Sequence, residues 1–343
     1  MKKPFNYGSL ELDHNIVFSP LAGCSDYAYR KIARKYHSGL FFCEMVKMDA
    51  LIRNDLGTHD MLAYDACMHP IGAQLCGSKK ELAAPCAKIL EDLGFDTIDL
   101  NCGCPVDKVT KDGSGSGLLK EPELIGDILC EIKNAVSIPV SVKIRAGWDE
   151  SCICGPEIVR IAESAGADVI YIHGRTRKQG YTGPANRDYI REAKKASTTI
   201  PVFGNGDIFD GPSAKHMLEH TGCDGLLVSR GTMGAPWIAN DILHYLNTGE
   251  VTHHSFEELF EAFCEHIDII FRTKTEKRGA LDTRRISAWY LKNFPHTSSF
   301  RQRGSRVKTK QDVDELIRDI KSQKSLGSFR QDPLVHSQTT ASL

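Results

Sequence analysis

The stretch Thr97-Ile-Asp-Leu-Asn-Cys-Gly-Cys-Pro105 joins a predicted strand to a loop that carries a thiol. Apolar and polar side chains alternate from Thr97 to Asn101, which is the period of a strand, and the glycine and proline that follow end it. Cys104 therefore lies on the loop that leaves the strand. In a parallel barrel such loops build the active site, so Cys104 is a candidate catalytic residue. The alternative, a small apolar core thiol, stays open on this pattern alone.

Seven further short β-type runs alternate with amphipathic helical stretches up to about Leu246. Such alternation predicts βαβ units and a parallel sheet. The eight predicted strands are 16–20, 40–45, 71–76, 97–101, 140–145, 169–173, 201–205 and 225–229, with helices that include 80–93, 122–135, 155–164 and 212–220. Eight such units over about 250 residues predict a (β/α)8 TIM barrel. A doubly wound sheet is less favoured, because no Gly-x-Gly-x-x-Gly follows the first strand.

The composition indicates a globular protein with one large core and an appended smaller domain. The 343 residues are 41% hydrophobic, and a formal net charge of -1 means that any preference for a polyanion must come from local clusters. No apolar run follows Lys2 and Lys3, so we expect no secretory signal, no membrane span and a cytoplasmic location. The 12 cysteines include no Cys-x-x-Cys pair, which predicts reduced thiols and no metal site.

The predicted strands end in polar or glycine residues, and in a barrel these ends meet at one rim. A charged residue at one strand end usually marks only where the chain meets solvent, but here the pattern recurs at nearly every strand. The residues are Pro20, Leu21, Ala22 and Gly23; Glu44 and Met45; Gln74; Asn101; Lys143 and Arg145; His173, Gly174 and Arg175; Asn205, Gly206 and Asp207; and Ser229, Arg230 and Gly231. We predict that this rim forms the active site.

Two of these strand ends predict a phosphate site. The turns at 204–207 and 229–234 are glycine-rich and precede helices, where barrels often bind phosphate, and Arg230 adds positive charge. Either turn alone is also explained as an ordinary tight turn. Lys143 lies between Val142 and Ile144 and would need an anionic or carbonyl partner inside a barrel, whereas His173 is equally well explained as a core histidine.

The glycine-serine run that ends at Gly117 has glycines at positions 113, 115 and 117. Such a run is typical of a flexible linker or of a phosphate-binding nest, but it lacks the Gly-Lys-Ser/Thr ending of a P-loop. We predict a mobile active-site loop that closes over a bulky substrate beside Cys104.

The pattern changes near Thr248, which predicts a barrel over 1–248, a helical domain over 249–324 and a disordered tail over 325–343. The predicted helices of the second domain are 255–271, 281–294 and 311–323. Between positions 272 and 310, twelve basic residues face only Glu276 and Asp282, a charge distribution suited to a nucleic-acid backbone. These are Arg272, Lys274, Lys277, Arg278, Arg284, Arg285, Lys292, Arg301, Arg303, Arg306, Lys308 and Lys310.

These motifs together resemble the signature of the tRNA-dihydrouridine synthases, flavoenzymes that reduce uridine in tRNA, and most closely their bacterial B-type branch. The resemblance rests on the run from Ile98 to Pro105 and on six further motifs in the same order along the chain. Those motifs are 19–26, 142–145, 173–183, 205–208, 230–237 and 289–291, so that about 15–291 is covered.

The resemblance implies FMN as the cofactor, NADPH (or NADH) as the reductant and tRNA as the substrate. Cys104 would be the general acid, since an ordinary thiol is mostly protonated at neutral pH. The residues implied to hold FMN are Pro20, Leu21, Ala22, Gln74, Lys143, His173, Asn205, Gly206, Asp207, Ser229, Arg230 and Gly231. The residues implied to bind tRNA are Asn101, Arg175, Arg177, Arg284 and Arg285.

Two positions depart from the family pattern: Ser229 stands where a glycine is usual, and Ile286 stands where a histidine is usual. They put details of phosphate and tRNA contact in doubt rather than the reaction. Two other functions stay open, a barrel flavoenzyme that reduces a free pyrimidine, similar to dihydroorotate dehydrogenase, and a non-catalytic RNA-binding barrel. The first would not need the basic C-terminal domain, and the second would not need Asn101, Cys104, Lys143 and His173 together.

Overall fold

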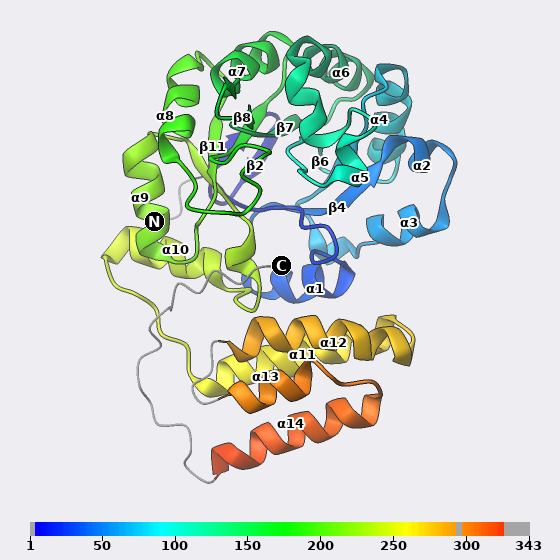
Figure 1. The fold of residues 1–343 in the computed structure, drawn as a ribbon, viewed down its shortest axis with the longest axis vertical. Helices are drawn as coiled ribbons and strands as arrows, with labels where there is room; N and C mark the ends of the chain where they lie inside the picture. The colour runs from blue at the N-terminus through cyan, green and yellow to red at the C-terminus, as the bar shows by residue number, and fades with distance from the viewer. Residues whose placement is uncertain (1–3, 293–296, 326–343) are drawn as a thin grey trace.

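The computed structural model describes residues 4–292 and 297–325 and contains a closed barrel of eight parallel strands (Figure 1). The strands are β3 (Ile16–Phe18), β4 (Phe41–Lys47), β5 (Ile71–Cys76), β6 (Thr97–Cys102), β7 (Val140–Arg145), β10 (Val169–His173), β11 (Val202–Asn205) and β12 (Gly225–Val228). They neighbour one another in chain order, and β12 pairs with β3 to close the barrel. The predicted TIM barrel and its eight strands are confirmed.

Helices cover the outside of the barrel (Figure 1). They are α1 (Tyr27–Tyr36), α2 (Met48–Ile52), α3 (Leu56–Leu62), α4 (Ala83–Asp92), α5 (Asp107–Thr110), α6 (Pro122–Ala135), α7 (Gly155–Ser164), α8 (Arg187–Ala196), α9 (Gly211–Thr221) and α10 (Ile238–Thr248). The predicted helices 122–135 and 155–164 match α6 and α7. The predicted helix 80–93 is divided into a 3-10 turn, Lys80–Leu82, and α4.

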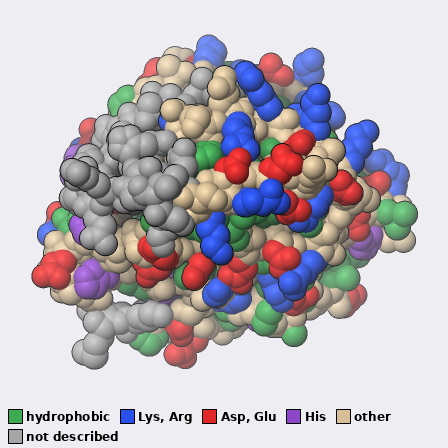
Figure 2. All heavy atoms as spheres, turned by 90° about the horizontal axis from the view of Figure 1, so that it is seen from below, with side chains coloured by type: hydrophobic (Ala, Val, Ile, Leu, Met, Phe, Trp, Pro, Cys, Tyr) green, Lys and Arg blue, Asp and Glu red, His purple; other side chains and the backbone are tan. Residues whose placement is uncertain are grey.

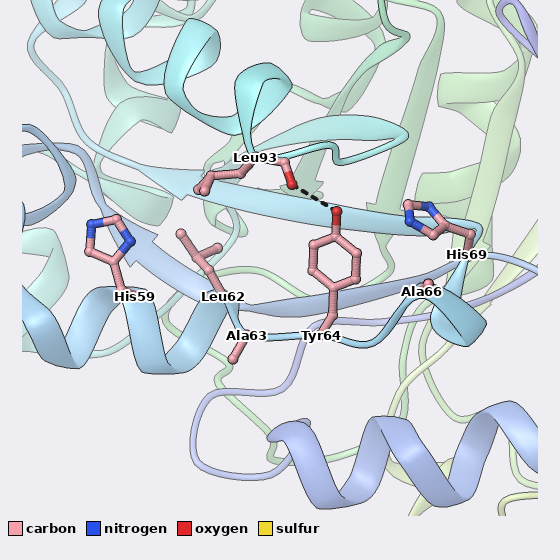
Figure 3. Close-up of a pocket in the computed structure, with 7 residues that line it drawn as sticks. All are labelled: His59, Leu62, Ala63, Tyr64, Ala66, His69 and Leu93. Carbon is pink, nitrogen blue, oxygen red and sulfur yellow. Dashed lines mark hydrogen bonds between the residues drawn. The ribbon is translucent and has the colours of Figure 1, made fainter.

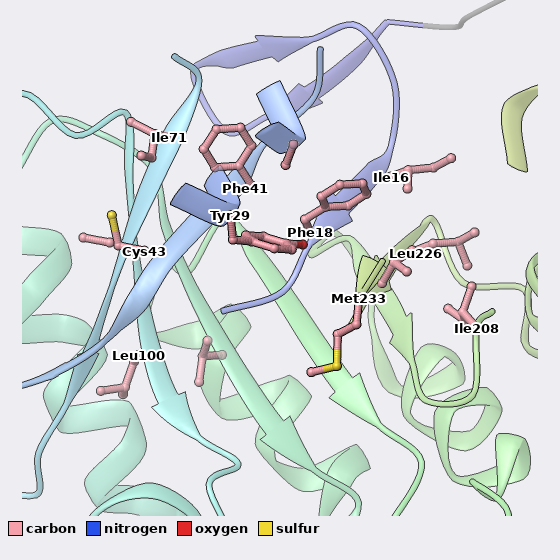
Figure 4. Packing of buried hydrophobic residues seen from close by; sticks show 14 of the residues in the cluster. Ile16, Phe18, Tyr29, Phe41, Cys43, Ile71, Leu100, Ile208, Leu226 and Met233 are labelled. Carbon is pink, nitrogen blue, oxygen red and sulfur yellow. The ribbon is translucent and has the colours of Figure 1, made fainter. Parts of the chain in front are cut away.

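Alternate side chains of the strands point to two different layers. The outward set, which includes Leu100 and Cys102 of β6, packs against the helices in one continuous apolar core. Figure 4 shows part of this core, where Phe18 and Phe41 from the strands lie near Tyr29 from α1.

The inward set fills the barrel at its amino-terminal end. A second apolar cluster there includes Phe42, Tyr171 and Phe203, and the hairpin of β1 (Phe5–Tyr7) and β2 (Leu10–Leu12) packs against it. The Tyr171 hydroxyl donates a hydrogen bond of 2.7 Å to the Tyr7 hydroxyl. This end of the barrel is therefore closed by packed side chains, and the polar inward residues lie toward the carboxyl ends of the strands.

Four further helices follow the barrel: α11 (Phe256–Thr273), α12 (Glu276–Leu291), α13 (Ser298–Gly304) and α14 (Lys310–Ser325). They stack beneath the barrel, with α11 against α1 and α14 farthest away (Figure 1). Residues 293 and 294 of the predicted helix 281–294 lie outside the described residues, as does the predicted tail apart from Ser325. In the part of the chain that the structure describes, no helix is long and apolar enough to cross a membrane.

The basic segment of the helical domain is less one-sided in space than in sequence. Its cations pair with acidic residues from outside the 272–310 window: Arg272 with Asp268, Lys274 with Asp26, Arg303 with Asp319 and Lys310 with Asp314. Figure 2, which views this side of the molecule, shows Lys and Arg interspersed with Asp and Glu. The predicted excess of positive charge is therefore partly cancelled by residues that a count within the window misses. Five exposed cations, Lys277, Lys292, Arg301, Arg306 and Lys308, have side chains with no acidic partner among the described residues.

Candidate active site

The two neighbouring thiols, Cys102 and Cys104, lie in different environments. Cys102 is the last residue of β6 and is fully buried in the layer between strands and helices, where burial raises the pKa of its thiol well above the ordinary value. Cys104 lies two residues beyond the strand and is half-buried. The alternation along β6 thus gives Cys102 a packing role and places Cys104 at the mouth of the barrel.

Asn101 holds the loop that carries Cys104. Its side-chain Oδ1 accepts hydrogen bonds from the backbone N–H groups of Gly103, at 3.1 Å, and Cys104, at 2.9 Å. From the other side, Ser116 donates to the Cys104 carbonyl through its hydroxyl at 2.8 Å and through its backbone N–H at 3.1 Å. The loop is therefore tied both to the strand behind it and to the glycine-serine run.

That run does not form the mobile lid predicted from its glycines. Residues 114–119 are buried, and Gly115–Lys120 forms a 3-10 turn against the Cys104 loop. Gly115 has a φ of +60°, and a Cβ atom there would lie 3.0 Å from the Cys104 carbonyl oxygen. The prediction of a mobile loop is wrong in this respect: the glycines allow close packing behind Cys104 rather than movement over a substrate.

Lys143 and Arg145, both on β7, bring positive charge to the mouth. The Lys143 ammonium has no hydrogen-bond partner among the described residues, and burial, together with the Arg145 charge, lowers its pKa to about 8. It lies close enough to Cys104 for the two groups to interact electrostatically. Arg145 is buried and donates to the carbonyls of Gly103, at 2.9 Å, and Gly180, at 2.8 Å. Arg145 therefore braces the Cys104 loop, a role that the sequence did not indicate.

His173 at the end of β10 is neutral. Arg175 donates to its Nε2 atom at 3.2 Å, and since arginine is only a donor, this ring nitrogen must accept. Burial, with the surrounding Arg145 and Lys143 charges, lowers the pKa of His173 well below its ordinary value. A neutral ring with an accepting Nε2 carries its proton on Nδ1, so His173 can donate one hydrogen bond.

Arg175, which the resemblance implied as a tRNA-binding residue, contacts protein groups at the barrel mouth. It is 2% exposed, and its donors reach the Gly183 carbonyl at 2.6 Å and both carboxylate oxygens of Asp207 at 2.8 and 2.9 Å. Arg230 joins the same carboxylate at 3.1 Å. Two cations therefore converge on Asp207, and Arg175 positions residues of the mouth. A sequence motif shows that an arginine is present, but it does not show which groups the arginine binds.

The turn after β11 has the backbone conformation of an anion cradle. Gly206 has a φ of +119°, and Asp207, at +51°, is also left-handed. A Cβ atom on Gly206 would lie 2.7 Å from Ala185 and 2.9 Å from the His173 ring, so a larger residue would fill the cradle. The backbone N–H groups of Gly206 and Asp207 donate to no described residue, and orphan amides of this kind bind anions.

The turn after β12 lies beside the turn after β11. Asn205 donates to the Leu227 carbonyl at 2.6 Å and to the Ser229 hydroxyl at 3.0 Å, so Ser229 adds a bond between the two turns that a glycine would lack. Arg230 lies over the half-exposed ring of Tyr181, 5.0 Å from its centroid. The serine at position 229, where the family usually has a glycine, therefore links the two predicted phosphate turns.

Arg177 also contacts protein groups. It forms an ion pair with Asp107, which begins α5 three residues after Cys104, and it lies over the Trp148 ring at 4.7 Å. Lys120 lies over the same ring at 3.7 Å. Arg177 therefore joins the loops after β6, β7 and β10, and about one fifth of its side chain, 21%, stays exposed.

The predicted cofactor residues after β3 and on β5 lie toward the carboxyl ends of the strands. Gln74 is buried and shares a hydrogen bond of 2.8 Å with Asn101. Pro20, Leu21 and Ala22 precede Gly23, whose N–H donates to the carboxylate of Glu44 from the next strand. Burial raises the pKa of Glu44.

The two predicted tRNA contacts on α12 have different environments. Arg284 donates to the Val307 carbonyl at 2.8 Å, within the helical domain. Arg285 faces the barrel, where it pairs with Asp26 at 3.5 Å and lies over Trp289 at 5.1 Å. Ile286 is fully buried in the core of the helical domain, so the histidine expected there would have no exposed position from which to meet RNA.

A network of ion pairs joins the helical domain to the loop after β3. Lys274 contacts both Asp26, the N-cap of α1, and Asp282 of α12, which is buried. Burial alone would raise the pKa of Asp26, but the Lys274 ammonium outweighs it and lowers that pKa. Because Asp26 follows the 20–23 loop, this network connects the helical domain to the rim of the barrel mouth.

A separate hollow lies on the outside of the barrel (Figure 3). It is lined by His59, Leu62, Ala63, Tyr64, Ala66, His69 and Leu93. His69 lies just before β5 and Leu93 just after α4, so this hollow is near the amino ends of the strands. It contains none of the predicted site residues, and the residues of the barrel mouth form the candidate site.

A family model described as "Dihydrouridine synthase (Dus)" matches residues 17–325. The chain belongs to the dihydrouridine synthase family. It is 38% identical over 298 residues to a probable tRNA-dihydrouridine synthase of Rickettsia conorii, covering 86% of this chain and 89% of the relative. It is 34% identical over 325 residues to tRNA-dihydrouridine synthase B of Pseudomonas syringae pv. tomato, covering 94% and 96%. The predicted resemblance, and with it the prediction of an enzyme, is confirmed.

Solved structures with a similar fold include two oxidoreductases. Histamine dehydrogenase from Rhizobium sp. 4-9 has a TM-score of 0.56 at 12% identity, over 78% of this chain and 50% of that chain. A morphinone reductase variant in complex with tetrahydroNAD has a TM-score of 0.53 at 10% identity, over 71% and 90%. At these identities the likeness shows the shared barrel fold of this dihydrouridine synthase family member and nothing finer.

Proposed function

We propose that this chain reduces the C5=C6 bond of uridines in tRNA to 5,6-dihydrouridine, with FMN as cofactor and NADPH or NADH as electron donor. The observation that carries the proposal is the position of Cys104. It is a half-buried thiol at the barrel mouth, held by Asn101 and close to the charge of Lys143. The tRNA-dihydrouridine synthases among its relatives supply the substrate class, and tRNA as substrate is consistent with a cytoplasmic enzyme.

The residues at the mouth fit FMN. The cradle at Gly206 and Asp207, the neighbouring Ser229 to Gly231 turn and Arg230 suit its phosphate. The unpaired Lys143 ammonium, the donor on His173 and the second N–H of Gln74 Nε2, beside the one that binds Asp99, suit the polar edge of its ring. The backbone from Pro20 to Ala22 closes the side next to β3. Bound FMN would supply the hydride that is added to C6 of the uracil.

The side chains of this protein supply the rest of the reaction. Cys104 donates its thiol proton to C5, and Asn101 fixes the loop from which the sulfur reaches the base. A uracil stacked in RNA must leave the stack to enter the mouth, and the helical domain, with Arg285 facing the barrel, contacts the surrounding tRNA. Arg177, at the edge of the mouth, keeps enough exposed surface to contact a neighbouring phosphate.

The test is to purify the full chain, identify any yellow cofactor released on denaturation, and reduce the bound cofactor with NADPH in the absence of oxygen. We expect FMN, and we expect tRNA lacking modifications to restore the oxidised spectrum whereas free uracil and orotate do not. A protein that stays colourless after incubation with FMN would contradict the cofactor. Reoxidation by a free pyrimidine but not by tRNA would favour the dihydroorotate dehydrogenase-like alternative.

A further inference from the structure

Asp99 is a buried carboxylate inside the barrel for which neither the family motif nor the proposed chemistry supplies a role. It lies on β6 two residues before Asn101, so both side chains point inward, and it is 1% exposed. Ser141 donates to its Oδ1 atom at 2.7 Å, and Gln74 Nε2 donates to its Oδ2 atom at 2.7 Å. Its environment is therefore a polar layer directly beneath the mouth.

The hydrogen bonds continue upward from Asp99 to the catalytic loop. Asn101 Nδ2 donates a hydrogen bond of 2.8 Å to Gln74 Oε1. Asn101 Oδ1 in turn accepts a hydrogen bond of 2.9 Å from the backbone N–H of Cys104. A single chain of bonds thus runs from the carboxylate through two amides to the backbone of Cys104.

The direction of this chain is determined at both ends. A backbone N–H can only donate, so Asn101 must present its oxygen to the Cys104 loop and its nitrogen to Gln74. An ionised carboxylate can only accept, so Gln74 must present its nitrogen to Asp99 and its oxygen to Asn101. Both requirements assign the same orientation to the two amides, and either amide would lose a bond if it turned over.

The ionisation of Asp99 supports this assignment. Burial raises its pKa, while the Gln74 and Ser141 bonds and the Lys143 charge oppose the rise, which leaves the pKa at about 6. At neutral pH most of the carboxyl groups are therefore ionised and accept from both neighbours.

We propose that Asp99 is a positioning residue that acts through Gln74 and Asn101 to hold the Cys104 loop in place. This assignment rests on the proposed function for its catalytic consequence, but the position of the loop can be measured without tRNA, reductant or turnover. Asp99 has no direct contact with Cys104, so its effect must pass through the two amides.

A polarity swap tests the chain of bonds. In Gln74→Glu the new carboxyl group faces Asp99, so two acceptors oppose each other once both groups are ionised, and the rates are therefore compared at pH 7.5 and at pH 9. In the double variant Gln74→Glu with Asp99→Asn, the amide introduced at position 99 donates to the carboxylate introduced at position 74, and the complementary pattern returns. Asp99→Asn alone keeps an oxygen for Gln74 and serves as the mild control.

The readout is the alkylation rate of Cys104 by iodoacetamide in the full-length protein at pH 7.5 and at pH 9, each variant being compared with wild type at the same pH. The rate is followed by peptide mass spectrometry because 12 cysteines are free. We expect Gln74→Glu to speed alkylation by about fivefold or more, since a released loop exposes the thiol, and the double variant to return to within about twofold of wild type. An unchanged rate in Gln74→Glu, or a double variant no slower than Gln74→Glu, would overturn the proposal.

A second pair keeps the test decisive if Gln74→Glu does not fold. Asp99→Leu removes the acceptor at the base of the chain, whereas Ser141→Ala removes the other partner of Asp99 and leaves the chain to Cys104 intact. Faster alkylation in Asp99→Leu but not in Ser141→Ala supports the proposal, and equal rates in the two variants contradict it. If wild type fails to modify tRNA while this order of rates holds, the proposed function fails and the role of Asp99 stands.

Discussion

Nη2 of Arg175 lies within 2.9 Å of both carboxylate oxygens of Asp207, and this ion pair links the ends of β10 and β11 at the barrel mouth. The Arg175 side chain is 3% exposed, whereas that of Asp207 is 24% exposed. The same arginine fixes the tautomer of His173. We therefore expect a change at Arg175 to affect the predicted cofactor site more than the binding of RNA.

Replacing Arg175 by alanine should weaken FMN binding by about tenfold or more, because Asp207, beside the proposed phosphate cradle, then loses both bonds from Arg175 and keeps Arg230 as its cationic partner. The affinity of the FMN-saturated protein for tRNA should change by less than about threefold, which filter binding would measure. The control is Arg191→Ala, which removes a surface arginine paired with Asp188. Normal FMN affinity with loss of tRNA binding would show that Arg175 contacts RNA after all.

Alanine variants of the two thiols at the end of β6 should differ in the rate at which tRNA reoxidises the reduced flavin. Cys104→Ala should still bind FMN and accept electrons from NADPH, but its reoxidation by tRNA should be slower by a factor of at least about one hundred, because the proposed general acid is missing. Cys102→Ala removes a small buried side chain and should lower stability by about 1 kcal/mol with little kinetic effect. Single-turnover reoxidation measures both variants, and rapid turnover by Cys104→Ala would mean that another group supplies the proton.

Lys143→Met should make the cofactor-free protein more stable at pH 7, by about 1 to 3 kcal/mol in denaturant unfolding. The reason is that the pKa of Lys143 falls to about 8 in the folded state. Between pH 8 and the ordinary lysine range, the unfolded chain binds the proton that the folded chain releases, so the contribution of Lys143 to stability rises with pH.

The free energy of unfolding of Lys143→Met should lack this increase with pH. The difference in stability between the variant and wild type should therefore shrink above pH 8. The FMN affinity of the variant should fall, since the unpaired positive charge at the mouth is gone. An apo variant less stable than wild type at pH 7 would show that Lys143 already has a partner inside the protein.

The exposed cations of the helical domain should contribute to tRNA affinity through charge alone. Replacing Lys277, Arg301, Arg306 and Lys308 by alanine should weaken tRNA binding and reduce the slope of log affinity against log salt by about 0.7 to 0.9 for each phosphate that the protein no longer neutralises. Folding and FMN content should not change, because all four side chains are exposed. Four exposed cations on the outer helices of the barrel, Lys88, Lys195, Lys215 and Arg160, are the control, and an equal loss of tRNA affinity there would indicate non-specific attraction.

The barrel could be predicted closely because its signals are local. Each strand carries its own apolar run and turn residues, and β6 also encodes in its alternation which thiol faces the helices. The convergence of Asn101, Lys143 and His173 then follows from the geometry of a parallel barrel.

The roles of the arginines could not be predicted, because they depend on partners that are distant in the chain. Arg175 meets Asp207, Arg177 meets Asp107, and Lys274 meets Asp26 across 248 positions. The prediction of a mobile loop from the glycine-serine run failed for a related reason. Glycine is equally common where a chain moves and where it must pack closely, and only the position of Cys104 against Gly115 distinguishes the two.

The most direct measurement is the nucleoside composition of unmodified tRNA after incubation with the purified chain, FMN and NADPH, determined by mass spectrometry. We predict that specific uridines gain two hydrogen atoms and appear as dihydrouridine, with no such product from Cys104→Ala or without NADPH or NADH. Unchanged uridine in tRNA treated with the FMN-loaded wild-type protein, when that protein is fully reduced by the donor, would contradict the account.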